Sequence, residues 1–353
     1  PITGAAHFTP QTLTLRGVKT TYVGHPITLA ADVTAFKPLK ASFNVDAPFL
    51  NLDLLIERFR SDLPEEEAEP AAEDLARYEG IELSGALHSA RIELGDVTFT
   101  DFDSHFLLED GVLRIPEFEF DSLEGSFRGD GVFERFFERD ARTLALTTKI
   151  QGLDVTELSK ALGFENDSVT GRVDAVSRLK GKARDWPAFR DSLEGGLSFH
   201  MSNGAIKGFP ILSRILDLLA LNVGGLVTGA MEYDAIDGDF VFRSGTGSTR
   251  NFLVDSKTMK IRAAGDVILP SQSVDLLIEA QPLSRLDMAL GAIPLVGSIL
   301  TGPDASRGLV AVYFTAKGPV EDPEVKTASV DSLLVSPWRG ARDWMFQLLA
   351  PEK

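Results

Sequence analysis

The chain of 353 residues is 44% hydrophobic and 25% charged, a balance typical of folded proteins that excludes disorder over most of the length. Its 52 acidic and 35 basic side chains leave a net charge of −17, which argues against binding to nucleic acid or to anionic lipid surfaces. The lack of cysteine excludes disulfides, thiolate catalysis and zinc sites built from cysteine.

The first segment, residues 1–60, carries three runs in which apolar and polar side chains alternate, as in strands with one buried face. The runs lie near 13–15, 27–33 and 43–47, and a helical pattern follows over 51–59. We therefore predict a β repeat unit over 1–60. The N-terminus has no basic region ahead of an apolar core, so we recognise no signal peptide and expect a fragment or the mature end of a longer protein.

The next segment, residues 61–80, is dominated by Glu, Ala and Pro, and it is predicted to be a solvated acidic linker. A second β repeat unit is predicted over 81–165. Within it, Phe118 and Phe120 alternate with acidic residues, and a further alternating run covers 143–150. A short helix then begins at Asp154 or Thr156, because either side chain can accept a hydrogen bond from free backbone N–H groups. The repeated pattern is strand, strand, strand, helix.

One strand of this unit carries Asp101, Asp103 and His105 at alternate positions, a spacing that places potential metal ligands on one face. Exposed strand faces carry such residues routinely, and the sequence shows no second pair of ligands. The surface interpretation is therefore favoured, and no metal site is predicted.

The region 166–330 is predicted to hold further one-sided strands, with apolar helices at 209–221 and 283–300. Gly and Pro interrupt both helical runs. One interpretation is that these helices plug the open end of a sheet. The other is that they contact a bilayer or line a lipid exit, in which case Leu295 and Ile299 are candidate membrane contacts.

The last segment, residues 331–353, is predicted to be an amphipathic tail that contains Trp338 and Trp344. We expect the tail to pack back onto the sheet. The alternative is that both tryptophans dock at a membrane interface.

Catalytic patterns are missing from the sequence. It contains no Gly-x-Ser-x-Gly elbow, phosphate-binding loop, His-Glu-x-x-His pair or calcium loop. Its many paired acids alternate with apolar residues and belong to the solvent face of strands. We therefore expect no enzyme, no catalytic residues and no cofactor.

Several turn motifs carry a resemblance to a known family. They are Leu123–Gly131, Gln151–Val155, Ser192–Leu197 with Asn203–Gly208, Pro294–Gly297, and Tyr313–Val320 with the following Asp322-Pro323. Through them the chain resembles the AsmA-like family of Gram-negative envelope proteins, in particular the carboxy-terminal region of bridge-like lipid transfer proteins of the YhdP/TamB type.

The resemblance implies a periplasmic protein, anchored to the inner membrane in its full-length form, whose long curved sheet carries phospholipid between the two membranes. The resemblance implies no catalytic residues. Envelope proteins are possible partners.

The fold expected from the residues and the resemblance together is mainly β, with a long curved and largely antiparallel sheet that forms an elongated groove, and with short apolar helices in the C-terminal part. The predicted groove lining is Phe118, Phe120, Leu144, Leu146, Ile150, Leu197, Phe199, Met201, Ile261, Val267, Leu276 and Ile278. Two alternatives remain open at this point. The first is a scaffold that aids outer-membrane protein assembly. The second is a closed β-sandwich binding module, which alternation does not exclude because an open groove and a sandwich both bury one face of each strand.

Overall fold

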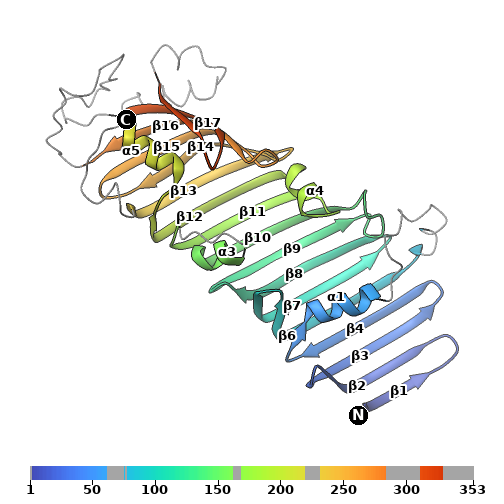
Figure 1. Ribbon diagram of the computed structural model, residues 1–353. Coiled ribbons are helices and arrows are strands. Elements are labelled where there is room, and N and C mark those ends of the chain that lie inside the picture. The colour runs from blue at the N-terminus through green and yellow to red at the C-terminus, as the bar shows by residue number, and fades with distance from the viewer. Residues whose placement is uncertain are drawn as a thin grey trace, which may run out of the picture. The chain divides into compact units, whose positions relative to one another are not determined.

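The computed structural model describes residues 2–61, 75, 78–161, 168–218, 231–283 and 311–328. These residues form eighteen strands and a few short helices (Figure 1). The mainly β, largely antiparallel and open curled fold is therefore confirmed. Contacts divide the chain into a first unit, Pro1–Leu162 with Ala175–Ser192, and a second unit, Gly163–Asp174 with Leu193–Lys353.

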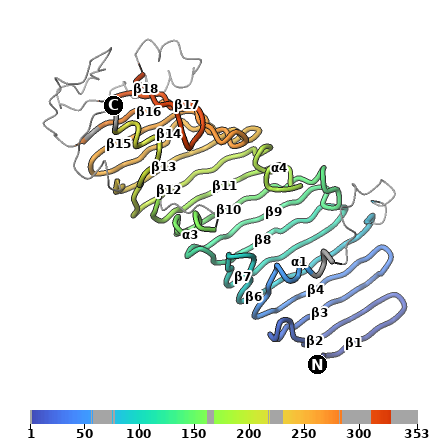
Figure 2. Tube along the Cα trace, in the orientation of Figure 1, coloured from blue at the N-terminus to red at the C-terminus, as the bar shows by residue number. Residues whose placement is uncertain are grey.

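The first unit begins with an antiparallel meander, which Figure 2 follows along the Cα trace. Its strands are β1 (Thr3–Phe8), β2 (Leu13–Tyr22), β3 (His25–Phe36) and β4 (Leu39–Ala47). A short β5 (Leu50–Asn51) leads into α1 (Leu52–Ser61), which confirms the helix predicted over 51–59. The three predicted alternating runs do not include β1, whose residues are all exposed and lack a clear alternation, although the chain begins in strand-like sequence.

The chain then continues through β6 (Glu82–Leu94), which pairs in parallel with β4 and β5. The strands β7 (Val97–Glu109), β8 (Val112–Ser122), β9 (Gly125–Glu134) and β10 (Thr143–Asp154) follow in antiparallel order. Five strands precede α1, and five more precede α3 (Val155–Ala161), so the repeat is longer than the predicted three strands and a helix.

The start of α3 is fixed by the predicted cap. The Asp154 Oδ1 atom accepts hydrogen bonds from the backbone N–H groups of Thr156 at 2.8 Å and Glu157 at 3.0 Å. This is the role expected of an aspartate at the N-cap. The short helix α4 (Trp186–Asp191) is capped by Asp185 in the same way, at 2.7 Å from the Ala188 N–H group.

The second unit holds β12 (Glu194–Ile206), α5 (Pro210–Leu218) and an antiparallel run of strands. These strands are β13 (Met231–Arg243), β14 (Thr246–Asp255), β15 (Met259–Ile268), β16 (Ser273–Pro282), β17 (Val312–Pro319) and β18 (Glu324–Thr327). The strand β11 (Arg172–Lys182) contributes its first three residues to the second unit and the remainder to the first.

Each unit has its own hydrophobic core where a helix covers the sheet. In the first unit Leu52 and Leu55 of α1 pack over buried Ala47, Leu50 and Ile92. In the second unit α5 packs on the inner face of β13 to β17 and forms the larger core. The sheets are otherwise open on this face, and no second sheet packs on them in the part of the chain that the structure describes. This excludes the closed β-sandwich for that part.

Several predictions fall outside the described residues. They concern most of the 61–80 linker, the 283–300 helix after Leu283, the 331–353 tail, and the candidate membrane contacts Leu295, Ile299, Trp338 and Trp344. The predicted 209–221 helix is present as α5 over its described part. Among the described helices, none has the length and apolar character needed to cross a bilayer.

Candidate functional site

The first unit carries a continuous apolar face, which follows directly from strand register. Residues directly opposite each other on paired strands point to the same side of a sheet. One set of such partners crosses nine strands, from β1 to β10 without β5, and every member is apolar. This set, the apolar row, is Phe8, Leu13, Val33, Ala41, Leu83, Leu108, Leu113, Phe133 and Leu144.

Most side chains of the apolar row are only half-buried, and Phe8 is 70% exposed. Only Leu108 is fully buried. A row of apolar side chains that stays accessible on eight of its nine strands is unusual for a sheet in water, because moving each such side chain out of water lowers the free energy. The described residues of the first unit therefore leave an accessible apolar face on one side of the sheet.

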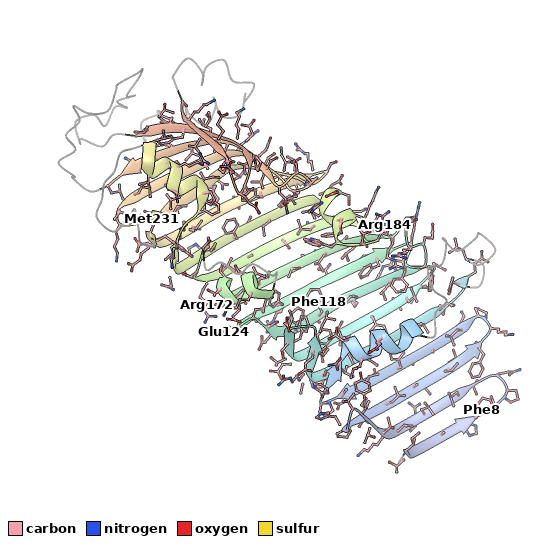
Figure 3. All side chains as sticks on the ribbon, in the orientation of Figure 1. Phe8, Phe118, Glu124, Arg172, Arg184 and Met231 are labelled. Carbon is pink, nitrogen blue, oxygen red and sulfur yellow. The ribbon has the colours of Figure 1, made fainter. Side chains whose placement is uncertain are left out.

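Aromatic rings gather in the middle of this face. The ring of Phe120 lies within 6 Å, centroid to centroid, of the rings of Phe99, Phe102, Phe118 and Phe127. Figure 3 shows Phe118 among the side chains of β8. Offset stacking and edge contacts of this kind hold the rings in fixed positions. The cluster therefore forms a rigid aromatic patch in the middle of the apolar face.

Two phenylalanine rings on the apolar face lie over glycines of the neighbouring strand. Phe106 lies opposite Gly85, and Phe118 lies opposite Gly129. A Cβ atom added at Gly85 or at Gly129 would stand only 2.7 Å or 2.8 Å, respectively, from the Cζ atom of that ring. The same Cβ atom would also stand 2.3 Å from the Phe43 carbonyl oxygen at Gly85 and 2.0 Å from the Thr147 carbonyl oxygen at Gly129. The neighbouring backbone and the ring together therefore require glycine at each position.

The opposite face of the first unit is polar and carries ion pairs between neighbouring strands. Lys40 pairs with Glu82, and the guanidinium of Arg128 contacts Glu119, in each case across neighbouring strands. These groups are largely exposed, so they contribute solubility more than stability. The sheet is therefore amphipathic, with hydrocarbon on one side and charge on the other.

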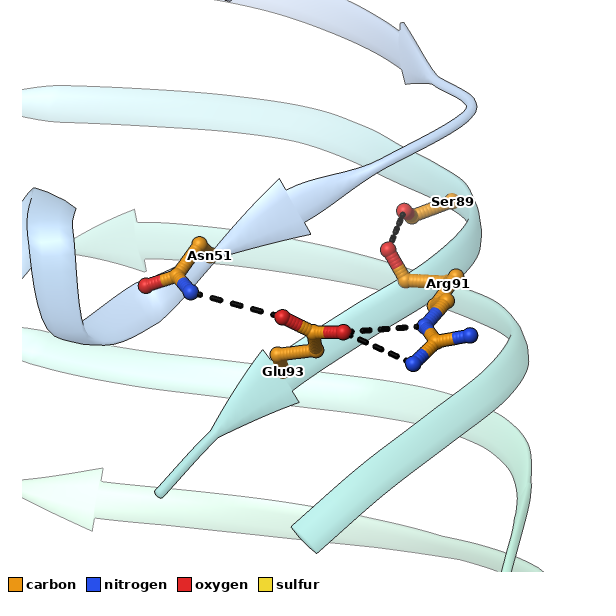
Figure 4. Close-up of polar contacts among 4 residues, drawn as sticks. All are labelled: Asn51, Ser89, Arg91 and Glu93. Atoms are coloured by element: carbon orange, nitrogen blue, oxygen red, sulfur yellow. Dashed lines mark hydrogen bonds and ion pairs between the residues drawn. The ribbon is translucent and has the colours of Figure 1, made fainter. Parts of the chain in front are cut away.

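Polar contacts at its first turn fix α1 over the apolar face (Figure 4). Asn51 accepts a hydrogen bond from the Leu54 N–H group at 3.0 Å, and its Nδ2 atom donates to Glu93 at 3.4 Å. Glu93 also binds Arg91, with 2.7 Å between Nη2 and Oε1. The backbone carbonyl of Arg91 accepts a bond from fully buried Ser89 at 3.0 Å. Together these bonds hold the start of α1 against β6.

The second unit holds a partly open pocket on the apolar face of its own sheet. Register connects Met201, Ile236, Val254, Ile261, Ala280 and Val312 on one side of β12 to β17. The helix α5 covers part of this side and leaves a cavity of about 260 Å³, here named the α5 pocket. Among the residues that line it are Phe209, Ile211, Leu212 and Ile215 of α5 with its lead-in, and Val320 of the β17–β18 turn.

Thr249 is the one exception to an otherwise hydrocarbon lining of the α5 pocket. Its side chain is 4% exposed, and its hydroxyl has no hydrogen-bond partner among the residues that the structure describes. Thr249 lies opposite Gly265, which places its side chain on the pocket side of β14. An unpaired hydroxyl in apolar surroundings is costly, so it marks a position to explain.

The predicted groove residues divide between the two units. The strands of the first unit place Phe118, Phe120, Leu144, Leu146 and Ile150 on its apolar face. In the second unit Ile261, Val267, Leu276 and Ile278 line the α5 pocket, Phe199 and Met201 pack against the adjoining core, and Leu197 lies opposite pocket residue Phe240. Whether any of them contacts lipid stays a prediction.

Sequence reasoning missed the α5 side of the pocket and the threonine inside it. The helix was recognised as apolar, but periodicity alone does not show which sheet a helix covers. Thr249 gave no signal because a threonine is ordinary in a strand. The missed aromatic residues Phe102 and Phe127 alternate with polar neighbours as Phe118 does. Phe127 also lies opposite the predicted residues Phe120 and Ile150, whereas Phe102 lies opposite Ser89.

The structure also bears on the Asp101, Asp103 and His105 face and on the ion pair of Arg214. The Asp103 and His105 side chains remain exposed, and the nearest contact of Asp103 is with His88 at 3.4 Å, which fits a surface pair. Arg214 and Asp217 lie three residues apart in the sequence of α5, a spacing that would allow an ion pair. The structure pairs the Arg214 guanidinium with Asp322 of the β17–β18 turn, because the helix presents this side chain toward that turn.

The comparisons with known proteins agree with an amphipathic open sheet. A family model described as AsmA family matches residues 30–229, more than half of the chain. The chain belongs to the AsmA family. The matched region includes β3 to β12 and α5, and so contains most of the apolar face of the first unit and the helix over the α5 pocket.

The comparison with curated proteins found no match, and neither did the comparison with solved structures. AsmA-family proteins are envelope proteins of Gram-negative bacteria, and the open β-sheet of this member is compatible with lipid transport in the envelope.

Proposed function

We propose that this AsmA-family chain is a non-enzymatic lipid conduit, the periplasmic segment of a bridge-like protein of the YhdP/TamB type. In the full-length protein an inner-membrane anchor holds it in place, and phospholipids move along its apolar faces between inner and outer membrane. The observation that carries the proposal is the apolar row, whose register partners stay apolar across nine strands and accessible at most of them.

The energetic problem of lipid transport explains why such a face is useful. A two-chain phospholipid exposes about thirty methylenes in water, at roughly 0.8 kcal/mol each, or on the order of 25 kcal/mol. An apolar face removes most of that cost by covering the acyl chains. The face also needs no tight site, because a strongly held lipid would not move on. Half-buried aliphatic and aromatic side chains without charged groups among them meet both demands.

The proposal assigns no chemical step and no cofactor to the chain. Phospholipid is its cargo, the apolar helices are its candidate membrane contacts, and other envelope proteins are candidate partners. The net charge of −17 and the ion pairs on the outer face favour solvent on that side. The hydrocarbon of the lipid is then the part recognised, and the head group stays in water.

The test is a charge placed on the apolar face, with a matched charge on the other face of the same strand. Leu146→Asp puts a carboxylate beside Gly131 on the apolar side of β10, and Gln151→Glu adds the same charge opposite Ser126 on the polar side. An acyl chain that covers an unpaired carboxylate removes it from water, which costs free energy and disfavours lipid at that position. We expect L146D to lower phospholipid transfer between vesicles severalfold and Q151E to leave it unchanged.

The proposal is refuted if the wild type and L146D transfer phospholipid equally well while circular dichroism shows that both chains are folded. A result in which neither carries lipid but both co-purify with an envelope protein would favour the assembly scaffold instead.

A further inference from the structure

The apolar face of the first unit ends, beside β9 and β10, in a loop that carries arginines. This loop, residues 135–142, holds Arg135, Arg139 and Arg142, and it is here named the arginine rim. Because the chain as a whole has a net charge of −17, the arginine rim is a local exception. Figure 3 shows the side chains at this edge of the sheet, near the labelled Arg184.

Arg142 lies directly beside the apolar row. Its Cζ atom stands 5.1 Å from the centroid of the Phe136 ring, which is a cation–π contact. The Phe136 ring in turn makes an edge contact with Phe133, a member of the apolar row, at 6.2 Å between centroids. The row continues on β10 with Leu144, two residues after Arg142. One aromatic ring therefore separates the guanidinium from the hydrocarbon of the face.

Backbone hydrogen bonds fix the position of Arg142. Its N–H group donates to the Glu138 carbonyl at 2.7 Å, and its own carbonyl accepts from the Ala183 N–H group at 2.9 Å. The arginine rim is also tied to the β7–β8 turn, because the Phe136 N–H group donates to the Gly111 carbonyl at 2.8 Å. The side chain thus extends from a backbone that is held on both sides.

The guanidinium of Arg142 has no carboxylate partner among the described residues. Asp185, in the loop that bonds to the Arg142 backbone, pairs with Arg184 at 2.8 Å instead. Burial and, to a smaller extent, the charge of Arg139 lower the pKa of Arg142 below its ordinary value. Partial burial and a like-charged neighbour both disfavour a lone cation, and a bound anion would offset both effects.

The terminal nitrogens of Arg142 are the part that a ligand can reach. Within the described part of the chain, Nε is the only nitrogen of this side chain that is both buried and unpaired. The side chain as a whole is half-buried, so Nη1 and Nη2 remain at the surface. These two nitrogens can donate to two oxygens of a phosphate, a pairing for which the planar guanidinium is well shaped. The arginine rim is therefore suited to a phosphate at the edge of the apolar face.

We propose that Arg142 binds the phosphate of a phospholipid head group while one acyl chain of that lipid lies on Phe133 and Leu144. The inference rests on the proposed lipid conduit and adds one head-group contact to a face that otherwise recognises hydrocarbon. The net charge of −17 disfavours approach to an anionic bilayer surface. A single lipid that already lies on the face brings only its own phosphate, so the arginine rim can act without such an approach.

Three probes test the inference on the full chain: dihexanoyl phosphatidylglycerol, dihexanoylglycerol and inorganic phosphate. The two lipids have the same acyl chains and differ in the head group that carries the phosphate. Isothermal titration calorimetry measures their affinities below the concentration at which they form micelles. We expect the wild type to bind the phosphatidylglycerol about tenfold more tightly than dihexanoylglycerol, the lower end for a hydrogen bond to a charged group. Inorganic phosphate is expected to bind most weakly, because it makes no contact with the apolar row.

Three substitutions locate the effect. Arg142→Gln is expected to abolish the preference for the phosphate-bearing lipid. Arg139→Gln changes an exposed side chain and is expected to reduce the preference in part, so it keeps the inference testable if R142Q does not fold by circular dichroism. The matched control is Arg178→Gln on β11, which removes the same charge from another exposed position and is expected to keep the full preference.

The acidic linker needs a control of its own, because its carboxylates can compete for the same arginines. Glu65, Glu66, Glu67 and Glu69 are therefore replaced together by glutamine, and Arg142→Gln is repeated in that background. We expect the loss of preference to be the same as with the native linker. A loss that occurs only with the native linker would assign Arg142 to the linker and overturn the inference.

The outcomes separate this inference from the proposed function. If the wild type binds both lipids equally, or R142Q keeps the preference, the phosphate contact is refuted, whereas a loss of vesicle transfer in L146D still supports the conduit. If inorganic phosphate binds as tightly as the phosphatidylglycerol, the arginine rim is an anion site unrelated to lipid, which also refutes the inference. If neither lipid binds the wild type and L146D transfers lipid normally, both proposals fail.

Discussion

At the scale of single residues, the cross-strand pairs of phenylalanine and glycine show what a sequence can and cannot reveal. The alternation of Phe118 and Phe120 with acidic residues predicts their common face correctly. The need for Gly129 opposite Phe118 is invisible in the sequence, because a glycine in a strand reads as a weak position or a bulge. Only the register shows that the ring lies over the glycine.

The pair gives a direct prediction about stability. In Gly129→Ala the new methyl group would stand 2.8 Å from the Phe118 Cζ atom and would also clash with the backbone carbonyl of Thr147. We expect the free energy of unfolding to fall by about 1–3 kcal/mol, as in overpacked cores. Urea denaturation measures it.

The matched control is Gly131→Ala on the same strand, where the nearest atom, Leu146 Cδ1, would lie 3.6 Å away. This is an ordinary contact, so we expect a change below about 1 kcal/mol. Equal losses in G129A and G131A would show that the close approach of the Thr147 carbonyl and the Phe118 ring does not require glycine at position 129.

At the scale of elements, strands with one wet face were easier to predict than strands covered on both sides. The sequence of β17 is apolar at successive positions, which predicts cover on both faces. The structure confirms this, since Phe314 is buried on the pocket side and Tyr313 is buried on the other. Glu279 of β16 lies opposite Tyr313 and is also buried, although alternation assigns this acidic residue to solvent.

Glu279 therefore predicts a pH dependence. Burial raises the pKa of its carboxyl above the ordinary value, and Arg262, at 3.3 Å, offsets part of the rise. The folded chain thus holds this proton more tightly than the unfolded chain. The corresponding stability is present below about pH 4.5 and is lost as pH rises through the folded-state pKa, with a slope of at most about 1.4 kcal/mol per pH unit.

Glu279→Gln lacks this titration. The unfolding free energy of E279Q, measured relative to the wild type by urea denaturation, should therefore rise with pH across that window. Tyr313→Phe serves as the control, because it keeps the Glu279 carboxyl and its burial. The pKa of Tyr313 itself is raised to about 12, mainly by burial, outside the range of the experiment. A constant difference between E279Q and the wild type would refute the prediction.

At the scale of the whole molecule, the sequence predicted the class of fold and the family, because both depend on features that repeat along the chain. One-sided alternation predicted an amphipathic antiparallel sheet, and the turn glycines carried the resemblance to the AsmA family. The enclosure of a pocket by α5 was not predictable, since it depends on where the helix lies in space. The same limit applied to the partner of Arg214.

The two units lead to a prediction that separates lipid occupancy from lipid transport. Leu146 lies on the apolar face of the first unit, and Ala263 lines the pocket of the second, which the ring in Ala263→Phe would fill. If the chain is the proposed lipid conduit, lipid bound to it is the sum over both units, whereas transfer needs both apolar surfaces. We expect L146D and A263F each to lower bound phospholipid only in part, and the double variant to lower it by the sum of the two losses, since the substitutions share no partners. Each single variant should nevertheless reduce vesicle-to-vesicle transfer as strongly as the double. Native mass spectrometry of gently purified chains counts the lipid, and complete loss of lipid in either single variant would contradict independent binding by the two units.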